Sequence, residues 1–431
     1  MLPEKDRKAI VALIKREVVP AIGCTEPVAV ALCTSRASEL LDGEPETVNV
    51  LLSANILKNA MGVGIPGTGM TGLPIAVALG ALAGNSGYGL EVLKDITQED
   101  VERAKAFIED RRVKISLKEG ISEKLYVEVE VRTRNKSACA IIAGGHTNFI
   151  FLSRGDELLL DRRGEKSGSE DGEELCPELN LSTVWEFATT APLEEIEFIL
   201  EARRLNKAAA EASFQGEYGH KLGKILKREL EQQTMGDSIF SRMLSYTSAA
   251  CDARMAGAMI PVMSNSGSGN QGIAATLPVV VYAEENGAGL EQMTRALVLS
   301  HLTAIYIKQS LGRLSALCGC VVASTGSSCG ITLLMGGDYT RVTFAVKNMI
   351  ANLTGMICDG AKPSCALKLT SGVSTAVLSA MLAMQNECVS SVEGIIDEDV
   401  DQSIRNLVSI GADSMNETDR KVLDIMTSKS K

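Results

Sequence analysis

The spacing of hydrophobic residues divides the chain into helical, strand-like and again helical stretches. Residues 5–22 carry apolar side chains at the spacing of a helix that faces a core. Between residues 113 and 160, apolar residues alternate or run over strand lengths with turn signals between them, which predicts a β region. From Thr183 onward the spacing is mostly helical again. We therefore expect the strands to be confined to the middle of the chain.

A strand, a glycine-rich loop and an apolar helix follow one another between residues 48 and 84. The strand is predicted for VNVLLSAN, the loop is GVGIPGTGMTG and the helix is LPIAVALGALAG. Such a unit can hold a phosphate at the helix N-terminus. The loop lacks the lysine of a P-loop, however, and its glycines do not match the spacing of a dinucleotide fingerprint. We interpret these glycines as a means of close packing between helix and strand.

Composition favours a core of small aliphatic residues. Hydrophobic residues make up 45% of the 431 residues, whereas aromatic residues make up only 4%. Between Arg313 and Asp338 no residue is charged, which is a length that could cross a membrane. The many Ser, Thr and Gly residues of this segment favour instead tightly packed helices in a soluble core.

The charge balance limits the classes of partner. The formal net charge of −11 argues against a nucleic-acid-binding surface and against binding to anionic lipid. The first residues are charged and contain no continuous apolar stretch of the signal-peptide kind. We expect a cytoplasmic protein that binds neither nucleic acid nor membrane.

Eleven cysteines are scattered along the chain, and the segment from Leu314 to Lys368 is rich in them. Their odd number, without an export signal, argues against disulfides. Paired CxxC motifs are absent, which makes a zinc ribbon a poor fit. Thiolates gathered from separated helices suit an iron–sulfur cluster, although close packing of small residues also explains such a grouping.

Three other features could carry chemistry. Cys24 stands at a predicted helix N-terminus, where the helix dipole can lower the pKa of a thiol; a small capping residue is the alternative. The loop SNSGSGNQG, residues 264–272, crowds short polar side chains among glycines, so it could bind a carboxylate or simply join two helices. His146 lies beside paired glycines at a strand junction, where it either faces a site or stabilises a turn.

Several long motifs, in the same order, resemble the L-cysteine desulfidase family. They are GCTEPVAVAL, SANILKNAMGVGIPGTGMTGLP, SNSGSGNQGI, LGRLSALCGC and ICDGAKPSCALK. That family is related to the α chain of bacterial iron–sulfur L-serine dehydratases, and the resemblance covers nearly the whole chain. It implies a lyase that converts L-cysteine to pyruvate, ammonia and sulfide by α,β-elimination.

The resemblance also implies an oxygen-sensitive 4Fe-4S cluster held by three cysteines, with one iron open to a small amino-acid substrate. The implied cluster ligands are Cys318, Cys358 and Cys365, with Cys320 as the alternative to Cys318. The candidate catalytic residues are Cys24, which is either a base or a fourth ligand in the resting state, Lys58 and His146. The candidate substrate-binding residues are Asn55, Asn59, Ser266, Ser268, Asn270 and Gln271.

Other functions stay open at this point. An L-serine dehydratase would use the same cluster mechanism and differ only in its substrate. A pyridoxal-phosphate lyase would perform the same elimination, but no lysine stands in a recognisable cofactor motif and the cysteines would have no role. A member of the family without activity, binding a small molecule, would belong to another class of protein.

The same resemblance predicts an α+β fold. Residues 1–43 and 186–431 would form a mainly helical, discontinuous domain that holds the cluster. Residues 44–185 would form an inserted α/β domain, similar to the β chain of serine dehydratases. The polar segment 160–184 is interpreted as a surface loop and a candidate boundary. We also expect the protein to be a homo-oligomer.

Overall fold

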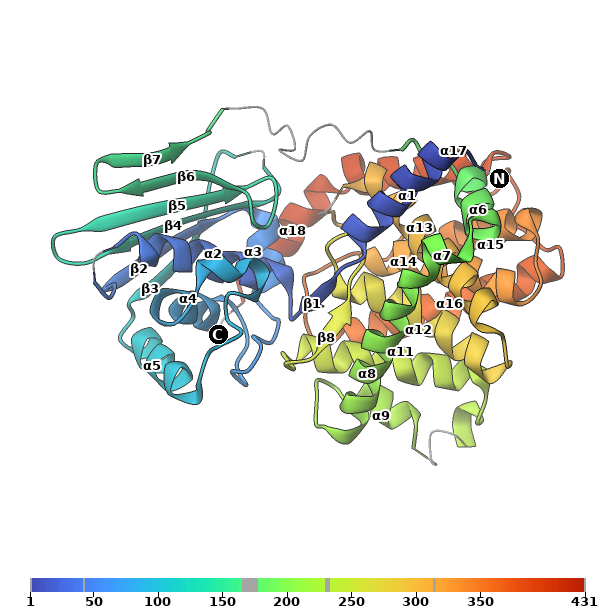
Figure 1. Cartoon of the computed structure of the whole chain (residues 1–431), viewed down its shortest axis with the longest axis horizontal. Helices are drawn as coiled ribbons and strands as arrows, with labels where there is room; N and C mark the ends of the chain where they lie inside the picture. Colours follow the sequence, from blue (N-terminus) through green and yellow to red (C-terminus); the bar gives the residue numbers. More distant parts are fainter. Residues whose placement is uncertain are drawn as a thin grey trace.

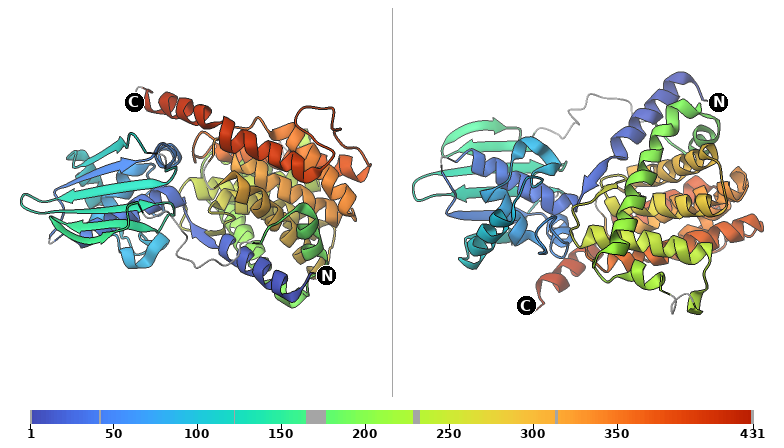
Figure 2. Two further views of the ribbon diagram at one scale, coloured as in Figure 1. Left: turned by 90° about the horizontal axis from the view of Figure 1, so that it is seen from above. Right: turned by 60° about the horizontal axis from the view of Figure 1, so that its bottom comes forward.

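The computed structural model describes residues 2–41, 43–121, 123–164, 177–228, 233–312 and 315–429. A strand-rich part and a helical body lie side by side, with the sheet at one end of the molecule and most helices at the other (Figure 1). Two further directions show the same arrangement (Figure 2). Residues 165–176, which belong to the polar segment interpreted as a surface loop, lie outside the described residues.

The sheet has six strands in the order β3-β2-β4-β5-β6-β7. β2 pairs with β3 in parallel, and every other neighbouring pair is antiparallel. The predicted β region therefore forms as expected, together with the strand predicted near residue 48. The strands are β2 (Thr47–Leu52), β3 (Val113–Leu117), β4 (Tyr126–Arg132), β5 (Ser137–Ala143), β6 (Phe149–Arg154) and β7 (Glu157–Asp161).

Helices cover one face of this sheet (Figure 1). Val127, Val129 and Val131 alternate along β4 and point into the same core, as expected for a strand with one buried face. The apolar helix predicted after the glycine-rich loop is α4, and it packs against α2 on the covered side of the sheet. The helices of this part are α2 (Thr25–Glu39), α3 (Ala54–Ala60), α4 (Leu73–Leu82), α5 (Gln98–Glu109) and the 3₁₀ helix η1 (Ser86–Glu91).

The helical body is built around α14, which packs against helices on several sides. Small residues on α14 allow this, because a Cβ added at Gly326 would lie 2.2 Å from the carbonyl oxygen of Ser300. Close approach of helix backbones, predicted from the composition of this segment, is confirmed. The elements are α1 (Glu4–Glu17), α6 (Leu181–Thr190), α7 (Leu193–Ile196), η2 (Glu197–Ile199), α8 (Leu200–Gln215), α9 (Leu222–Leu226), α11 (Ile239–Met255), α12 (Gly269–Glu285), α13 (Leu290–Leu311), α14 (Gly319–Leu334), α15 (Tyr339–Leu353), α16 (Cys365–Met384), α17 (Val400–Ser409), the π helix η3 (Ile410–Ser414) and α18 (Asn416–Thr427).

Two short strands lie outside the middle of the chain, where none was expected. β1 (Pro20–Ile22) pairs antiparallel with β8 (Pro261–Met263). The expectation that strands are confined to the middle is therefore wrong. Strands this short have no room for an alternating pattern, so hydrophobic spacing could not reveal them.

The hydrophobic contacts divide the elements into two large cores. The core beneath the sheet includes Val30 and Leu32 of α2, a helix that the predicted range 1–43 assigned to the helical domain. The core of the helical body includes Leu181 and Val184 of α6, although the predicted inserted range extends to residue 185. The fold is α+β as expected, while the insertion of one domain into another and its exact boundaries stay predictions.

One helix in the described part of the chain, α16, is long and apolar enough to cross a membrane by length and composition alone. Half of its apolar window is buried inside the molecule, and it packs against α11, α14 and α15. The uncharged segment before Asp338 forms the shorter helix α14.

Candidate active site

A cavity of about 110 Å³ lies where the first turn of α2, the loop before α12 and the two cysteine segments meet. It brings together nine of the side chains proposed from the sequence. Five further polar residues line it that the sequence did not single out: Glu26, Arg254, Lys308, Ser315 and Lys368. The nine are Cys24, Asn59, Ser268, Asn270, Gln271, Cys318, Cys320, Cys358 and Cys365.

Two chain segments present the cysteines by pairing with each other. The backbone N–H of Cys358 donates to the carbonyl of Ala316 at 2.6 Å, and that of Cys318 donates to Met356 at 2.9 Å. Cys318 is the N-cap of α14 and Cys365 is the first residue of α16, so two of the thiols stand at helix N-termini. Burial raises the pKa of the Cys318 thiol well above its usual value, and the neighbouring Cys320 and Cys358 raise it further.

The two thiols of the CGC motif differ in their surroundings. Sγ of Cys320 donates to the carbonyl of Lys368 at 3.2 Å and lies 3.5 Å from Oγ of Ser324. Sγ of Cys318 instead accepts a hydrogen bond from the backbone of its near neighbour Cys320. Both residues line the cavity, but only the thiol of Cys320 connects α14 to α16.

The described residues contain no group of three or more His, Cys, Asp or Glu side chains that could hold a single metal ion. A 4Fe-4S cluster requires a wider spacing of thiols than a single ion, because each cysteine binds a different iron. Cys318, Cys358 and Cys365 line one cavity and come from separate segments. The donor set therefore suits a cluster better than a single ion.

Cys24 donates a hydrogen bond from Sγ to Oε2 of Glu26 at 2.8 Å. Glu26 also accepts from Oγ1 of Thr25 and from Nδ2 of Asn59, each at 3.1 Å. Burial raises the pKa of the Cys24 thiol well above its usual value, and the charge of Glu26 raises it further. The expected lowering of this pKa is wrong, since desolvation and a neighbouring carboxylate outweigh the helix dipole.

Three buried polar atoms around the cavity have no hydrogen-bond partner in the described part of the chain. They are Nε of Arg254, Oε1 of Gln271 and Oδ1 of Asn59. Arg254 is only 3% exposed. A Cβ added at Gly269 would lie 2.3 Å from its Nε, so the glycine makes room for the guanidinium. Buried polar atoms are rarely left without partners, so these three indicate a place for a polar ligand.

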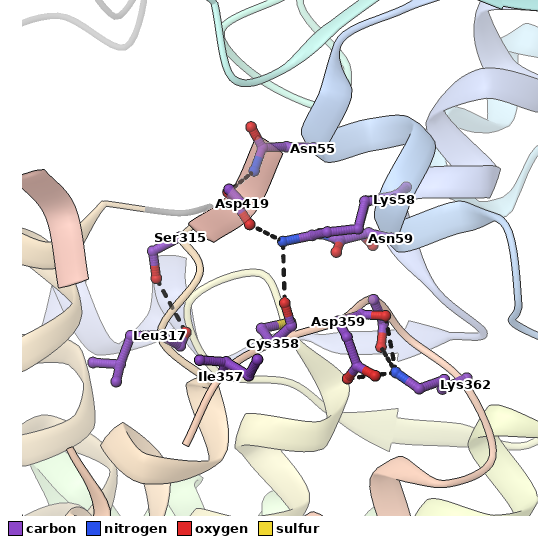
Figure 3. Close-up of polar contacts among 12 residues, drawn as sticks. Asn55, Lys58, Asn59, Ser315, Leu317, Ile357, Cys358, Asp359, Lys362 and Asp419 are labelled. Atoms are coloured by element: carbon purple, nitrogen blue, oxygen red, sulfur yellow. Dashed lines mark hydrogen bonds and ion pairs between the residues drawn. The ribbon is translucent and has the colours of Figure 1, made fainter. Parts of the chain in front are cut away.

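Four of the residues proposed from the sequence do not line the cavity. Lys58 forms an ion pair with Asp419, and its Nζ donates to the carbonyl of Cys358 at 3.4 Å (Figure 3). Nδ2 of Asn55 donates to the same Asp419 at 2.6 Å. His146 is buried and acts on Glu26 through its charge. Ser266 donates to Oδ1 of its neighbour Asn265 at 2.9 Å.

The glycine-rich loop before α12 has two distinct halves. Oγ of Ser264 donates to the carbonyl of Val19 at 2.6 Å, and the N–H of Ser266 donates to Glu17 at 2.9 Å. This half fixes the loop to the end of α1 and to β1. The other half, Gly267 to Gln271, faces the cavity, so only part of the loop can contact a ligand.

His301 contacts the first half of this loop, residues 264–266, through Asn265. Its Nδ1 accepts from Nδ2 of Asn265 at 3.1 Å, and its Nε2 lies 2.9 Å from Oγ1 of Thr276. Oγ1 of Thr276 donates to Gly272 at 2.7 Å, so the proton of the imidazole is on Nε2 and is donated to Thr276. Burial lowers the pKa of His301 to about 3, and the ring is neutral.

We expect this histidine to make the free energy of unfolding depend on pH. Between about 6.5 and about 3 the unfolded chain binds a proton at His301 and the folded chain does not, so stability is lost as the pH falls, by about 1.4 kcal/mol per pH unit. Chemical denaturation at several pH values measures this slope. His301→Gln should reduce the slope by about this amount relative to the wild type. An unchanged slope in His301→Gln would contradict this assignment.

Comparison with known proteins places these residues in a family. Residues 87–424 match the sequence model of the serine dehydratase alpha chain. The chain belongs to the serine dehydratase alpha chain family. The matched range includes Cys318, Cys358 and Cys365, whereas Cys24 and Asn59 precede it. Membership supports the general expectation of a lyase with iron–sulfur chemistry.

Close relatives span the whole chain. A protein of Bacteroides fragilis is 71% identical over 428 residues, covering 99% of this chain and all of its own length. One of Bacteroides thetaiotaomicron is 69% identical over 426 residues, covering 99% of both chains. One of Porphyromonas gingivalis is 55% identical over 429 residues, covering 98% of this chain and 99% of its own. Each carries the name UPF0597 protein, which does not specify a substrate.

The residues that sequence reasoning missed share a recognisable signal. Arg254 stands among small residues in SAACDARMAG, and Lys308 stands in the largely apolar second half of α13. Both are buried charges, which are rarely placed in a helix core without a partner or a ligand. A search for isolated charges in apolar helical segments would have identified both.

Proposed function

We propose that the protein is an iron–sulfur lyase that converts L-cysteine to pyruvate, ammonia and sulfide. One observation carries the proposal: a single cavity joins three cysteine thiols from separate segments to a buried arginine whose Nε has no hydrogen-bond partner among the described residues. Membership of the serine dehydratase alpha chain family supports the reaction class. The motifs shared with the L-cysteine desulfidase family support the choice of substrate.

Cys318, Cys358 and Cys365 are the proposed ligands of a 4Fe-4S cluster. We choose Cys318 over Cys320 because the thiol of Cys320 donates to the carbonyl of Lys368 at 3.2 Å, which is a closer contact than the 3.7 Å between the thiol of Cys365 and the carbonyl of Gly360. When bound, the cluster supplies a Lewis acid that makes the β-substituent a better leaving group. Lys308 lines the same cavity, and burial lowers the pKa of its ammonium to about 8, so at pH 7 it is mostly cationic and offsets the charge of the thiolates.

The partnerless atoms around the cavity match the two charged ends of a free amino acid. Nε of Arg254 is a donor and can bind a carboxylate, which arginine does with strong charge-assisted hydrogen bonds. Oε1 of Gln271 and Oδ1 of Asn59 are acceptors and can receive protons of an ammonium group. A zwitterion satisfies all three, whereas an inorganic anion satisfies only the arginine.

We assign removal of the Cα proton to Cys24. Its thiol is held 2.8 Å from Oε2 of Glu26, which is placed to accept the thiol proton; burial and the charge of Glu26 oppose this transfer in the ligand-free protein, and the charge of Arg254 favours it. The thiolate takes the Cα proton, the Cβ–S bond breaks and sulfide leaves. The aminoacrylate that is released then hydrolyses to pyruvate and ammonia.

L-Serine is the second candidate substrate. The family to which the chain belongs is named for the dehydration of serine, and the proposed contacts to carboxylate and ammonium are the same for both amino acids. In that reaction water leaves in place of sulfide. The two candidates differ only in the atom on Cβ.

The test uses protein purified without oxygen. Iron and acid-labile sulfide are assayed, and pyruvate formation from L-cysteine and L-serine is followed in parallel. We expect about four irons per chain, as in a 4Fe-4S cluster, and faster turnover of L-cysteine. Faster turnover of L-serine would establish the second candidate. Iron-free protein that makes pyruvate and is inhibited by a carbonyl reagent would contradict the cluster proposal and indicate pyridoxal phosphate.

A further inference from the structure

Lys58 is one of the most deeply buried lysines of the described chain, with 1% of its surface exposed. Its Nζ lies between two groups: a carboxylate oxygen of Asp419 and the carbonyl oxygen of Cys358 (Figure 3). It does not line the cavity, so it cannot touch a substrate there. A catalytic role is therefore a poor fit for this residue.

The same contacts connect three distant parts of the chain. Asp419 lies on α18, which packs against α3, the helix of Lys58. Asp419 is itself oriented by Asn55, whose Nδ2 donates to Oδ2 at 2.6 Å. Both carboxylate oxygens are thus occupied, one by each residue of α3. This fixes the ammonium of Lys58 in front of the Cys358 carbonyl.

The loop of Cys358 rests directly on α3. A Cβ added at Gly360 would lie 2.3 Å from the carbonyl oxygen of Lys58, and Gly360 has a φ of 91°. On its other side the loop is held by the hydrogen bond from the N–H of Cys358 to Ala316. The backbone of Cys358 is therefore held by two hydrogen bonds, and Lys58 donates one of them.

We propose that Lys58 is a positioning residue: with Asp419 of α18 it fixes the backbone of Cys358 and thereby the direction of that thiol. A buried ion pair contributes little net stability compared with an apolar pair of similar size, so its role here is geometric. The proposal rests on the proposed function only for the role of Cys358 as a cluster ligand. The contact between Lys58 and Cys358 is present in the protein without a cluster.

The test replaces both partners, Lys58→Met with Asp419→Leu. The double variant leaves no unpaired buried charge, so we expect it to fold with a melting temperature close to that of the wild type. In protein without iron, alkylation of Cys358 is followed by peptide mass spectrometry. We expect it to be about tenfold faster, since one hydrogen bond that closes the loop is lost. After anaerobic reconstitution, the iron content and the visible absorption of the cluster should fall.

Two controls separate loop positioning from a general loss of structure. Arg7→Met with Glu195→Leu removes another long-range ion pair, which joins α1 to α7 away from the cavity, and should leave Cys358 alkylation and iron content unchanged. Alkylation of Cys388, which is partly buried in a distant loop, should not change in either variant. Wild-type alkylation of Cys358 in the Lys58 double variant would overturn the proposal, whether or not the protein binds iron. Faster alkylation in protein that never binds iron would uphold the positioning role and refute the cluster.

Discussion

Cys358→Ala is expected to abolish pyruvate formation and to leave the protein unable to retain a full complement of iron. An alanine offers no ligand, and the cluster would keep only two of its proposed protein thiolates, those of Cys318 and Cys365. Activity should fall by far more than about a hundredfold, since groups that merely orient a metal ligand already cost about ten- to a hundredfold when replaced. The loss should appear in kcat and in iron content together.

The measurement is iron, acid-labile sulfide and pyruvate formation on anaerobic protein, with Cys388→Ala as the matched control. Cys388 is also a free, partly buried cysteine, but it lies outside the cavity and its thiol donates to the neighbouring carbonyl of Val389. It should keep full iron and full activity. A Cys358→Ala protein that retains four irons per chain, or turnover, would remove Cys358 from the ligand set.

Arg254→Met should lower kcat/KM for L-cysteine by about a hundredfold. The loss corresponds to about 3 kcal/mol, the upper range for a hydrogen bond to a charged group. Met fills a similar volume without a charge. Nε of Arg254 has no hydrogen-bond partner among the described residues, so the free energy of unfolding should change little. A loss of activity without a loss of stability distinguishes a ligand-binding residue from a structural one.

Steady-state kinetics with L-cysteine and inhibition by cysteamine, which lacks the carboxylate, provide the test. Binding of cysteamine should be the same in wild type and Arg254→Met, because the arginine has no group to bind on this compound. Arg203→Met, which removes a guanidinium paired with Glu284 outside the cavity, is the control for loss of positive charge. Equal losses for L-cysteine and cysteamine would show that Arg254 does not bind the carboxylate.

The sequence predicted those helices and strands that are recognisable from the residues of their own segment. The strands between Val113 and Asp161 and the helix after the glycine-rich loop follow from spacing and turn residues. The convergence of Cys358 and Cys365 on one cavity with the CGC motif was expected from the family resemblance. Spacing alone would not have indicated it, since small residues that pack helices closely include cysteine.

Features that depend on contacts between residues far apart in the sequence could not be predicted. α2 is buried around most of its surface, so its apolar residues do not tell which core it joins. Whether the Cys24 thiol has a raised or lowered pKa is decided by burial and by a carboxylate, neither of which the position at a helix N-terminus reveals. Lys58 lies in a motif that resembles the L-cysteine desulfidase family, but only the structure shows that it pairs with Asp419 and does not line the cavity.

The pairing of β1 with β8 has a consequence for the newly made chain. Oγ of Ser264 bonds to Val19 across 245 residues, and Cys24 follows β1 directly, so the wall of the cavity closes only when widely separated segments meet. Contacts of this range form slowly, because a long loop must be ordered before they provide any stabilisation. The ion pair between Lys58 and Asp419 likewise forms only after Asp419 has been synthesised. Under the proposed function, iron would therefore be inserted only after these segments have met.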